Sequence, residues 1–198
     1  MTTFALPTFP TLRTPRFVLR QITQDDLPAV FGGLSDPRVI ANYGVSYASA
    51  EQTQRQMDWF EEIYANRTGI WWAVCRSMER PALLGAVGLN DISVLHRRGE
   101  MGYWLLPEHW RQGIARECVS AVLDYAFGSL RLHRVGAEVD IDNHRSSNLL
   151  ERLGFHFEGV RRGCELKAGV FLDLKIYSRL ATDRRPGADS PPGPLPPG

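Results

Sequence analysis

Six residues, Trp110-Arg111-Gln112-Gly113-Ile114-Ala115, have the composition of a turn that binds phosphate. They follow an apolar run that ends at Pro107, and they precede a segment, 116–127, in which apolar residues recur at helical spacing. A helix that starts there presents unpaired backbone N–H groups at the positive end of its dipole. Gly113 and Ala115 are small enough to let phosphate oxygens reach those donors. The turn therefore predicts an anion site, although glycine and alanine also begin helices for packing reasons alone.

Carboxylates are the second group of residues that could do chemistry. In 135–141 every second residue is apolar (Val135, Ala137, Val139 and Ile141), which leaves Glu138 and Asp140 together on the other face of an expected strand. Two carboxylates on the second face of an interior strand require an explanation. They either serve a function, or they face solvent or pair with Arg134 or Arg145.

The elements that must position these residues form a mixed α/β pattern. The sequence predicts strands at 16–21, 70–76, 83–92, 99–106, 133–141, 155–162 and 169–180, and helices at 25–33, 50–64, 113–127 and 146–152. Asp25-Asp26 and Gly32-Gly33 suit the start and end of the first helix, and Ser49 with Gln52 resembles a capping box. The crossover from 99–106 through a helix to 133–141 makes these two strands parallel neighbours. Ligands bind where such strands part, which is also where the Gly113 turn lies.

Length and composition fit one soluble domain. The chain has 198 residues, of which 43% are hydrophobic and 23% charged. A net charge of +1 gives no case for nucleic-acid binding. No apolar run approaches the ~20 residues that span a membrane, and residues 1–10 lack the parts of a secretory signal. We therefore expect a cytoplasmic protein with no membrane contact.

The cysteines and the end of the chain bear on redox state and domain limits. Cys75, Cys118 and Cys164 are expected to be buried reduced thiols, and with the histidines they show no metal-ligand spacing. Residues 184–198 contain six prolines and three glycines and are expected to be a disordered tail. The predicted domain is therefore 1–183.

A later segment resembles a known family. An expected strand ends near Asn143, and a short helix beginning near Ser146 closes on Leu153-Gly154-Phe155, with Glu158-Gly159 just after. This pattern resembles the GNAT acetyltransferase superfamily, and within it the RimJ/RimL-type group, which acetylates protein N-termini and other amines using acetyl-CoA. Further stretches resemble the same group: Arg16–Arg20, Leu34–Pro37, Gly169–Asp173 and Tyr177-Ser178. The resemblance covers roughly residues 11–181.

The resemblance implies a GNAT fold: a mixed, mostly antiparallel sheet flanked by helices, whose parallel fourth and fifth strands splay apart. Acetyl-CoA would be the co-substrate, with its pyrophosphate held by backbone N–H groups of 112–115. In the family's signature Trp110 occupies a position where Gln or Arg is usual. The implied cofactor-binding residues are Leu105, Leu106, Arg111, Gln112, Gly113, Ile114, Ala115, Arg116 and Asn143.

Several of these residues also have a purely structural interpretation. Leu105 and Leu106 would pair by backbone with the pantetheine arm, or could be plain core. Arg111 and Arg116 would contact phosphate, although surface arginines near a helix start are common. Asn143 would bond the pantetheine or adenosine side of CoA, or cap the helix that follows it.

Acyl transfer from a thioester to an amine requires a neutral amine and a stabilised oxyanion, and the leaving thiolate benefits from a proton. Glu138 is the leading candidate for the base. Glu100 is the second candidate; it shares a face with Gly102 and Trp104, and it could act through a water.

The sequence differs from the wider family at the position of the general acid. Many GNAT enzymes carry a tyrosine five residues before the Phe of the Gly-Phe pair, and here that position is Leu150. Ser146 occupies the place where the RimJ/RimL group has a serine proposed for this role. We expect it to position the thioester or thiol; its alternative interpretation is a helix N-cap.

The pKa values of amines favour one class of acceptor over another. With pKa values of ~7.8 for an α-amine and ~10.4 for lysine, about 14% and about 0.04% are neutral at pH 7. This favours a protein N-terminal α-amine over lysine, with a small-molecule amine such as an amino sugar or polyamine as the alternative. A non-catalytic acyl-CoA-binding module and a nucleotide site are competing interpretations. The resemblance also makes a homodimer plausible.

Overall fold

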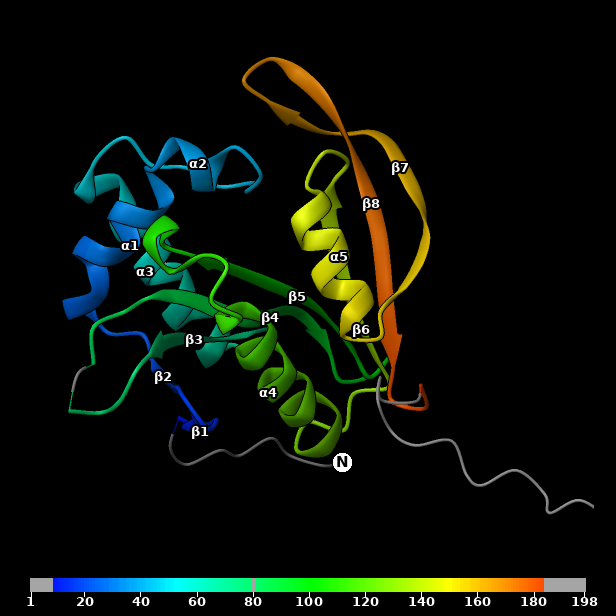
Figure 1. Cartoon of the computed structure of the whole chain (residues 1–198), viewed down its shortest axis with the longest axis horizontal. Coiled ribbons are helices and arrows are strands. Elements are labelled where there is room, and N and C mark those ends of the chain that lie inside the picture. The colour runs from blue at the N-terminus through cyan, green and yellow to red at the C-terminus, as the bar shows by residue number, and fades with distance from the viewer. Residues whose placement is uncertain (1–8, 80, 184–198) are drawn as a thin grey trace, which may run out of the picture.

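One sheet dominates the molecule (Figure 1). The computed structural model describes residues 9–79 and 81–183. In this part of the chain the strand order is β1-β2-β3-β4-β5-β6-β8-β7, and every neighbouring pair is antiparallel except β5 with β6. The strands are β1 (Leu12–Arg13), β2 (Val18–Gln21), β3 (Ile70–Cys75), β4 (Gly85–Ser93), β5 (Arg98–Leu105), β6 (Arg134–Asp140), β7 (His156–Lys167) and β8 (Val170–Leu180).

Helices cover both faces of the sheet. They are α1 (Leu27–Leu34), α2 (Pro37–Ile40), α3 (Ala50–Ala65), α4 (Ile114–Gly128) and α5 (His144–Arg152), with short 3-10 turns at Gln24–Asp26 and Pro107–His109. Figure 1 shows α4 and α5 in front of the sheet and α1 and α3 behind it. We call these the front and rear faces.

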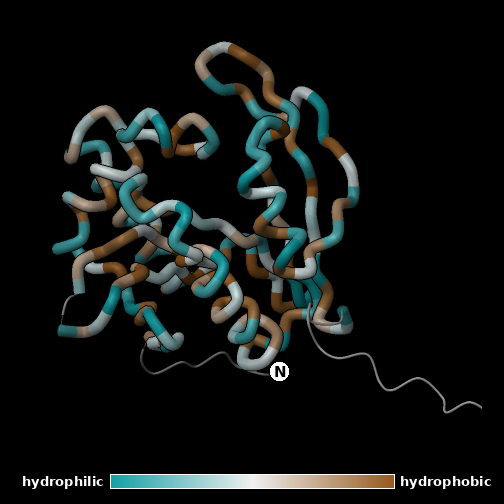
Figure 2. Tube along the Cα trace, viewed as in Figure 1, coloured by the Kyte–Doolittle hydropathy of each residue, from teal (hydrophilic) through white to brown (hydrophobic). Residues whose placement is uncertain are grey.

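Alternating side chains build a core on each face. On β3, Trp72 is fully buried in the front core with α4, and Trp71 is buried in the rear core with α1 and α3. Figure 2 shows hydrophobic segments within the sheet, and a further hydrophobic stretch at the tip of the β7–β8 hairpin. Trp71 and Trp72 are therefore core residues, which is the usual place of large aromatic side chains.

The parallel pair separates early. β5 and β6 are paired only from Arg98–Glu100 to Arg134–Gly136, and beyond Glu100 and Gly136 the two strands diverge. The twist of the sheet and the α4 crossover leave the later residues of β5 without a neighbour on that edge. This confirms the predicted splayed parallel pair.

The β7–β8 hairpin reaches across to the other half of the molecule. Near its tip, the Lys167 ammonium donates hydrogen bonds to the carbonyl oxygens of Ile40 (2.5 Å) and Ala41 (2.8 Å) just after α2. Figure 1 shows the tip leaning toward α2. The tip of the β7–β8 hairpin is therefore hydrogen-bonded to the C-terminal end of α2.

Most element boundaries agree with the sequence, and the differences have physical reasons. β1 and α2 were not expected, because elements of two and four residues carry no periodicity. Gly32-Gly33 does not end α1: both lie inside it, and a side chain at Gly33 would collide with the Trp104 ring. Gly33 is therefore small for packing.

Three further expectations need correction or lie outside the described residues. Cys164 is exposed, whereas Cys75 and Cys118 are buried free thiols. Ser49 caps α3 by accepting from the Gln52 N–H (3.2 Å), but the Gln52 amide oxygen accepts from Ala48 N–H rather than from Ser49, so the box is shifted by one residue. The predicted tail, 184–198, lies outside the described residues.

Candidate active site

The turn before α4 has the backbone of an anion site. Gly113 caps the helix with φ of +74°, in the left-handed region that favours glycine, and Arg111 also has a positive φ of +61°. The first backbone bond of α4 runs from Glu117 N–H to Gly113 O (3.2 Å). The N–H groups of the residues between them are those that a helix start leaves without an intrahelical acceptor.

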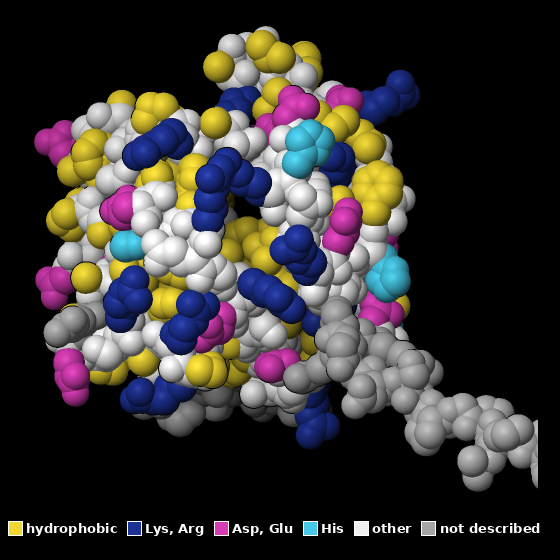
Figure 3. All heavy atoms as spheres, in the orientation of Figure 1, with side chains coloured by type: hydrophobic (Ala, Val, Ile, Leu, Met, Phe, Trp, Pro, Cys, Tyr) yellow, Lys and Arg dark blue, Asp and Glu magenta, His cyan; other side chains and the backbone are white. Residues whose placement is uncertain are grey.

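Arginines surround this turn. Arg16 forms an ion pair with Glu117 (2.6 Å) and donates to the Gln112 carbonyl (3.1 Å), so it braces the turn from β2's side. Arg111 and Arg116 are exposed. The residues that line an open groove of about 630 Å³ beside Gly113 include two carboxylates, Glu117 and Asp124, and five arginines from several elements: Arg13, Arg16, Arg116, Arg152 and Arg179. Figure 3 shows Lys and Arg side chains around a hollow with a hydrophobic floor. The positive charge favours a polyphosphate.

The edge of β5 that faces the split is only partly free. Leu106 donates its backbone N–H to Leu84 O (2.9 Å). This N–H is therefore not available for the pairing with the pantetheine arm that the sequence analysis predicted for Leu106. Tyr103 and Leu105 alternate with it and direct their backbone groups toward the split. The Leu105 carbonyl accepts from the Trp110 indole N–H (2.8 Å), which leaves the Leu105 N–H for a ligand.

Asn143 and Ser146 begin α5 on the far side of the split. Asn143 is the N-cap, and its side-chain oxygen accepts from the Ser146 N–H (3.1 Å). Its structural interpretation is therefore present in the fold, and only its amide NH₂ group remains for a ligand. Ser146 is not the N-cap: it is the third residue of α5, in its first turn, and its hydroxyl is 2.6 Å from the Tyr103 hydroxyl.

Glu100 lies on the rear face at the last paired position of β5. Its carboxyl packs directly over Gly136 of β6, where any side chain would collide with it. Burial raises the pKa of the Glu100 carboxyl, and the negative charge of Glu138 adds to the increase. Glu100 of β5 and Glu138 of β6, which the sequence analysis named as candidate bases, therefore lie on the same face of the sheet and interact.

Glu138 is more exposed and already paired. Its side chain is 40% exposed and forms an ion pair with Arg161 of β7 (2.7 Å). The sequence anticipated an arginine partner but placed it at Arg134 or Arg145. Arg134 instead pairs with Glu158 (2.6 Å), and Arg145 stacks over the Trp110 ring at 5.7 Å. The pairing with Arg161 depends on β7 lying beyond β8, which only the tertiary fold decides.

Tyr103 is the residue that the sequence analysis missed. It was read only as part of an apolar strand, yet its hydroxyl reaches α5 across the split. Its alternation with Glu100, Gly102 and Trp104 could have placed it on the front face. Nothing in the sequence could show that Ser146 lies opposite. Leu150, where many relatives have a tyrosine, is fully buried and has no access to a ligand.

The described residues, 9–79 and 81–183, contain no group of three or more His, Cys, Asp or Glu side chains placed to hold a metal ion. No helix among them is long and apolar enough to cross a membrane.

Comparison with known proteins decides the family. A model of the acetyltransferase (GNAT) domain matches residues 16–156, which include the Gly113 turn, both diverging strands and α5. The chain belongs to the GNAT acetyltransferases. It is 40% identical over 171 residues to the uncharacterized N-acetyltransferase YoaA of Bacillus subtilis, covering 86% of this chain and 96% of that one.

Two other similarities bear on the site. The chain is 31% identical over 98 residues to the ribosomal-protein-serine acetyltransferase of Escherichia coli, covering 50% of this chain and 55% of that one. The structure of spermidine N-acetyltransferase from Vibrio cholerae, in complex with CoA and spermine, superposes with a TM-score of 0.76 at 23% identity, covering 86% of this chain and 98% of that one. The latter similarity concerns the fold alone.

This GNAT acetyltransferase uses acetyl-CoA as its co-substrate. The structure fits that molecule: the left-handed Gly113 keeps the turn open to phosphate oxygens, the arginine-lined groove matches their charge, and the split leaves a strand edge for an extended chain. The protein is an acetyl-CoA-dependent N-acetyltransferase.

Proposed function

We propose that this enzyme transfers the acetyl group of acetyl-CoA to a protein N-terminal α-amine, with Glu100 as the general base. The observation that carries the proposal is the position of Glu100: half-buried, on the rear face, at the point where β5 and β6 separate. Its raised pKa makes the ionised form a stronger base than an ordinary carboxylate. The rear face is where the acceptor enters, because CoA approaches from the α4 and α5 side.

The donor side is assigned to the turn and the open strand edge. Backbone N–H groups of Gln112, Gly113, Ile114 and Ala115 hold the pyrophosphate, and Arg111 and Arg116 add charge at its rim. The Leu105 N–H and the Asn143 amide bind the pantetheine arm. Both retain a donor after their own intramolecular bonds are counted.

Glu138 takes a supporting part in this proposal. Its ion pair with Arg161 occupies the carboxylate, so it is less available than Glu100 to contact an acceptor amine. Its charge still raises the pKa of Glu100, and it adds negative potential where a cationic ammonium group must arrive. This reverses the order in which the sequence ranked the two carboxylates.

An α-amine suits a single carboxylate base. An α-ammonium with a pKa of ~7.8 loses its proton far more readily than a lysine at ~10.4. A terminal amine also reaches a buried base as the end of a chain, so the rest of a polypeptide can remain outside. The similarity to the ribosomal-protein-serine acetyltransferase supports the same class of acceptor.

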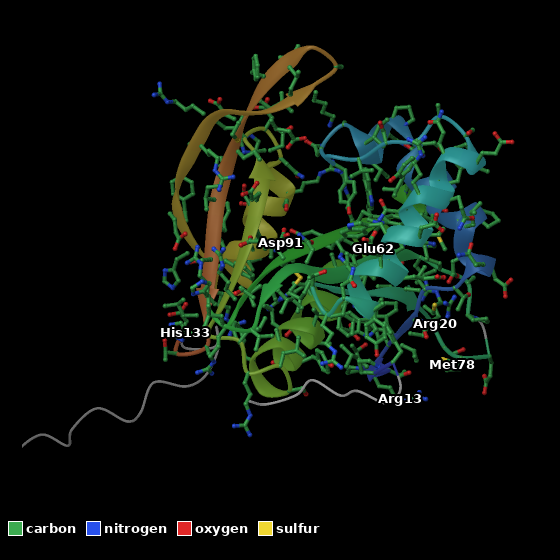
Figure 4. All side chains as sticks on the ribbon, turned by 180° about the vertical axis from the view of Figure 1, so that it is seen from behind. Arg13, Arg20, Glu62, Met78, Asp91 and His133 are labelled. Carbon is green, nitrogen blue, oxygen red and sulfur yellow. The ribbon has the colours of Figure 1, made fainter. Side chains whose placement is uncertain are left out.

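A polyamine is the second candidate, and a specific observation favours it. Glu138 and Asp91 act on the Glu100 carboxyl with negative charge and Arg134 and Arg98 act on it with positive charge, so the base and its charged neighbours comprise three carboxylates and two arginines. Figure 4 shows the rear face, where Asp91 lies beside the half of the sheet that α3 leaves uncovered. Such charge would attract a molecule with several ammonium groups. The solved relative with bound spermine has the same fold.

The test is a thiol-release assay with acetyl-CoA and three acceptor sets: peptides with free N-termini, the same peptides with blocked N-termini and one lysine, and polyamines. We expect turnover with the first set, and mass spectrometry should place the acetyl group on the α-nitrogen. Glu100→Gln should lower kcat by about 10²-fold or more while CoA affinity stays unchanged. Turnover confined to polyamines would replace the first acceptor with the second. The absence of CoA release with every amine would refute both.

A further inference from the structure

Tyr103 of β5 and Ser146 of α5 are joined across the split by a hydrogen bond between their side-chain hydroxyls. In the described part of the chain, this is the only hydroxyl–hydroxyl bond that connects β5 to α5. Tyr103 lies three residues beyond Glu100, where β5 has no pairing with β6, and Ser146 lies in the first turn of α5. The two oxygens are 2.6 Å apart. Neither residue is exposed.

We propose that Tyr103 positions the Ser146 hydroxyl so that it donates a hydrogen bond to the sulfur of CoA as the sulfur leaves. The inference deepens the proposed function and rests on it. The family resemblance already implies that Ser146 acts at the thiol; the new assignment is Tyr103, as the residue that orients the Ser146 hydroxyl.

The direction of the bond follows from the chemistry of the two hydroxyls. A phenol is more acidic than an aliphatic alcohol and is therefore the better donor, and a serine oxygen can accept one bond while donating another. Burial raises the pKa of Tyr103 to about 12, so the phenol keeps its proton at working pH. With Tyr103 donating to Ser146 Oγ, the serine proton turns away from the tyrosine and toward the split.

The serine itself is held in place by its backbone. Asn143 accepts from the Ser146 N–H (3.1 Å), which fixes the first turn of α5. This is also the positive end of the helix dipole, which favours a negative sulfur nearby. The chain O–H···O–H···S⁻ gains from cooperativity, because each bond polarises the next.

The step balances without a further reagent. The amine nitrogen forms a bond to the acetyl carbon, the bond from that carbon to sulfur breaks, and the electron pair leaves with the sulfur. The amine attacks in its neutral form, and the one proton that its nitrogen then loses passes to Glu100. Ser146 stabilises the thiolate by a hydrogen bond and keeps its own proton, so the thiolate takes its proton from solvent after release. A tyrosine at position 150 is not needed for this role.

The experiment compares Tyr103→Phe and Ser146→Ala with a matched control, Tyr125→Phe. Tyr125 is also a buried tyrosine, and its hydroxyl has no hydrogen-bond partner, so the control removes an equivalent hydroxyl that supports nothing. Two readouts are needed: kcat and KM for acetyl-CoA, and the thiol pKa of enzyme-bound CoA from thiolate ultraviolet absorbance. The second requires no acceptor.

We expect Tyr103→Phe and Ser146→Ala each to lower kcat about tenfold, to change the KM for acetyl-CoA less than twofold, and to raise the thiol pKa of bound CoA. The double variant should be no slower than Ser146→Ala, because both residues act through one hydrogen. Tyr125→Phe should match the wild type in all readouts. An unchanged thiol pKa in Tyr103→Phe, or additive losses in the double variant, would overturn the inference.

The two proposals fail in different ways. If no amine is acetylated but the thiol pKa of bound CoA rises in both variants, the acceptor assignment is wrong and the sulfur contact stands. If amines are acetylated and the thiol pKa does not move, Tyr103 and Ser146 have only a structural role.

Discussion

Replacing Gly136 with alanine should displace Glu100, the proposed catalytic base, without altering its chemistry. An alanine Cβ at this position would lie 2.5 Å from the Glu100 Oε1 and 2.6 Å from its Cδ, whereas ordinary contact begins at 3.4 Å. Oε2 lies closer still, so the carboxylate must move by at least 0.9 Å (3.4 Å less 2.5 Å). Because it is the end of a flexible side chain, it can do so at little cost to the fold.

A shift of this size has a calculable effect on the rate. Misplacing a catalytic group by ~1 Å costs about 10²-fold. We expect Gly136→Ala to lower kcat by about 10²-fold, to leave CoA affinity unchanged, and to change the melting temperature by only a few degrees. The assay is steady-state thiol release, with calorimetric CoA titration and thermal unfolding on the same preparations.

Two comparisons make the prediction specific. Gly32→Ala is the matched control, because an alanine Cβ there has no atom within 4 Å, and it should retain full activity. Gly136→Ala combined with Glu100→Gln should be no slower than Glu100→Gln alone, since both act on one group. Full activity in Gly136→Ala, or additive losses in the double variant, would refute Glu100 as the base.

Three further predictions follow from individual residues. Because Glu100 accepts a proton only when ionised and its pKa is raised by burial and by Glu138, kcat/KM should rise with pH through a pKa above the ordinary carboxyl value of ~4.3, and Glu100→Gln should remove that limb of the pH profile. Gly113→Ala places a side chain at φ +74°, so it should cost about 1 to 2 kcal/mol in unfolding free energy and weaken CoA binding, as measured by denaturant melts and calorimetric titration. Hydrogen bonding by Arg134 lowers the pKa of Glu158 to about 2, so the ionised carboxylate stabilises the fold above ~4.3 and this contribution disappears as pH falls toward about 2. Glu158→Gln should therefore flatten the loss of stability in this pH range, followed by circular dichroism.

The sequence was informative where chemistry is local. The Gly113 turn, the strand before it and the helix after it are determined by neighbouring residues, because glycine and periodic apolar residues act within a few positions of themselves. The same holds for Asn143 as a cap, since its acceptor group and the Ser146 N–H are three residues apart. The donor site and most elements were therefore predictable, and the family comparison agrees with the fold and the co-substrate.

The residues proposed to act on the acceptor and on the leaving sulfur depend on contacts between positions roughly 20 to 45 residues apart in the chain, which periodicity does not encode. Alternation placed Glu100 and Glu138 on one strand face each, but only the β5–β6 register put the Glu100 carboxyl over Gly136. Only the position of β7 gave Glu138 its partner Arg161.

The sequence by itself identified acetyl-CoA as the donor, because the Gly113 turn and the segment from Asn143 to Phe155, which carry the family resemblance, are each built from residues close together in the chain. The tertiary structure decided which carboxylate is buried beside the split and which hydroxyl faces Ser146. Burial and cross-strand contact are properties of the packed sheet. They change the pKa of a group and the direction of its hydrogen bonds without changing the sequence around it.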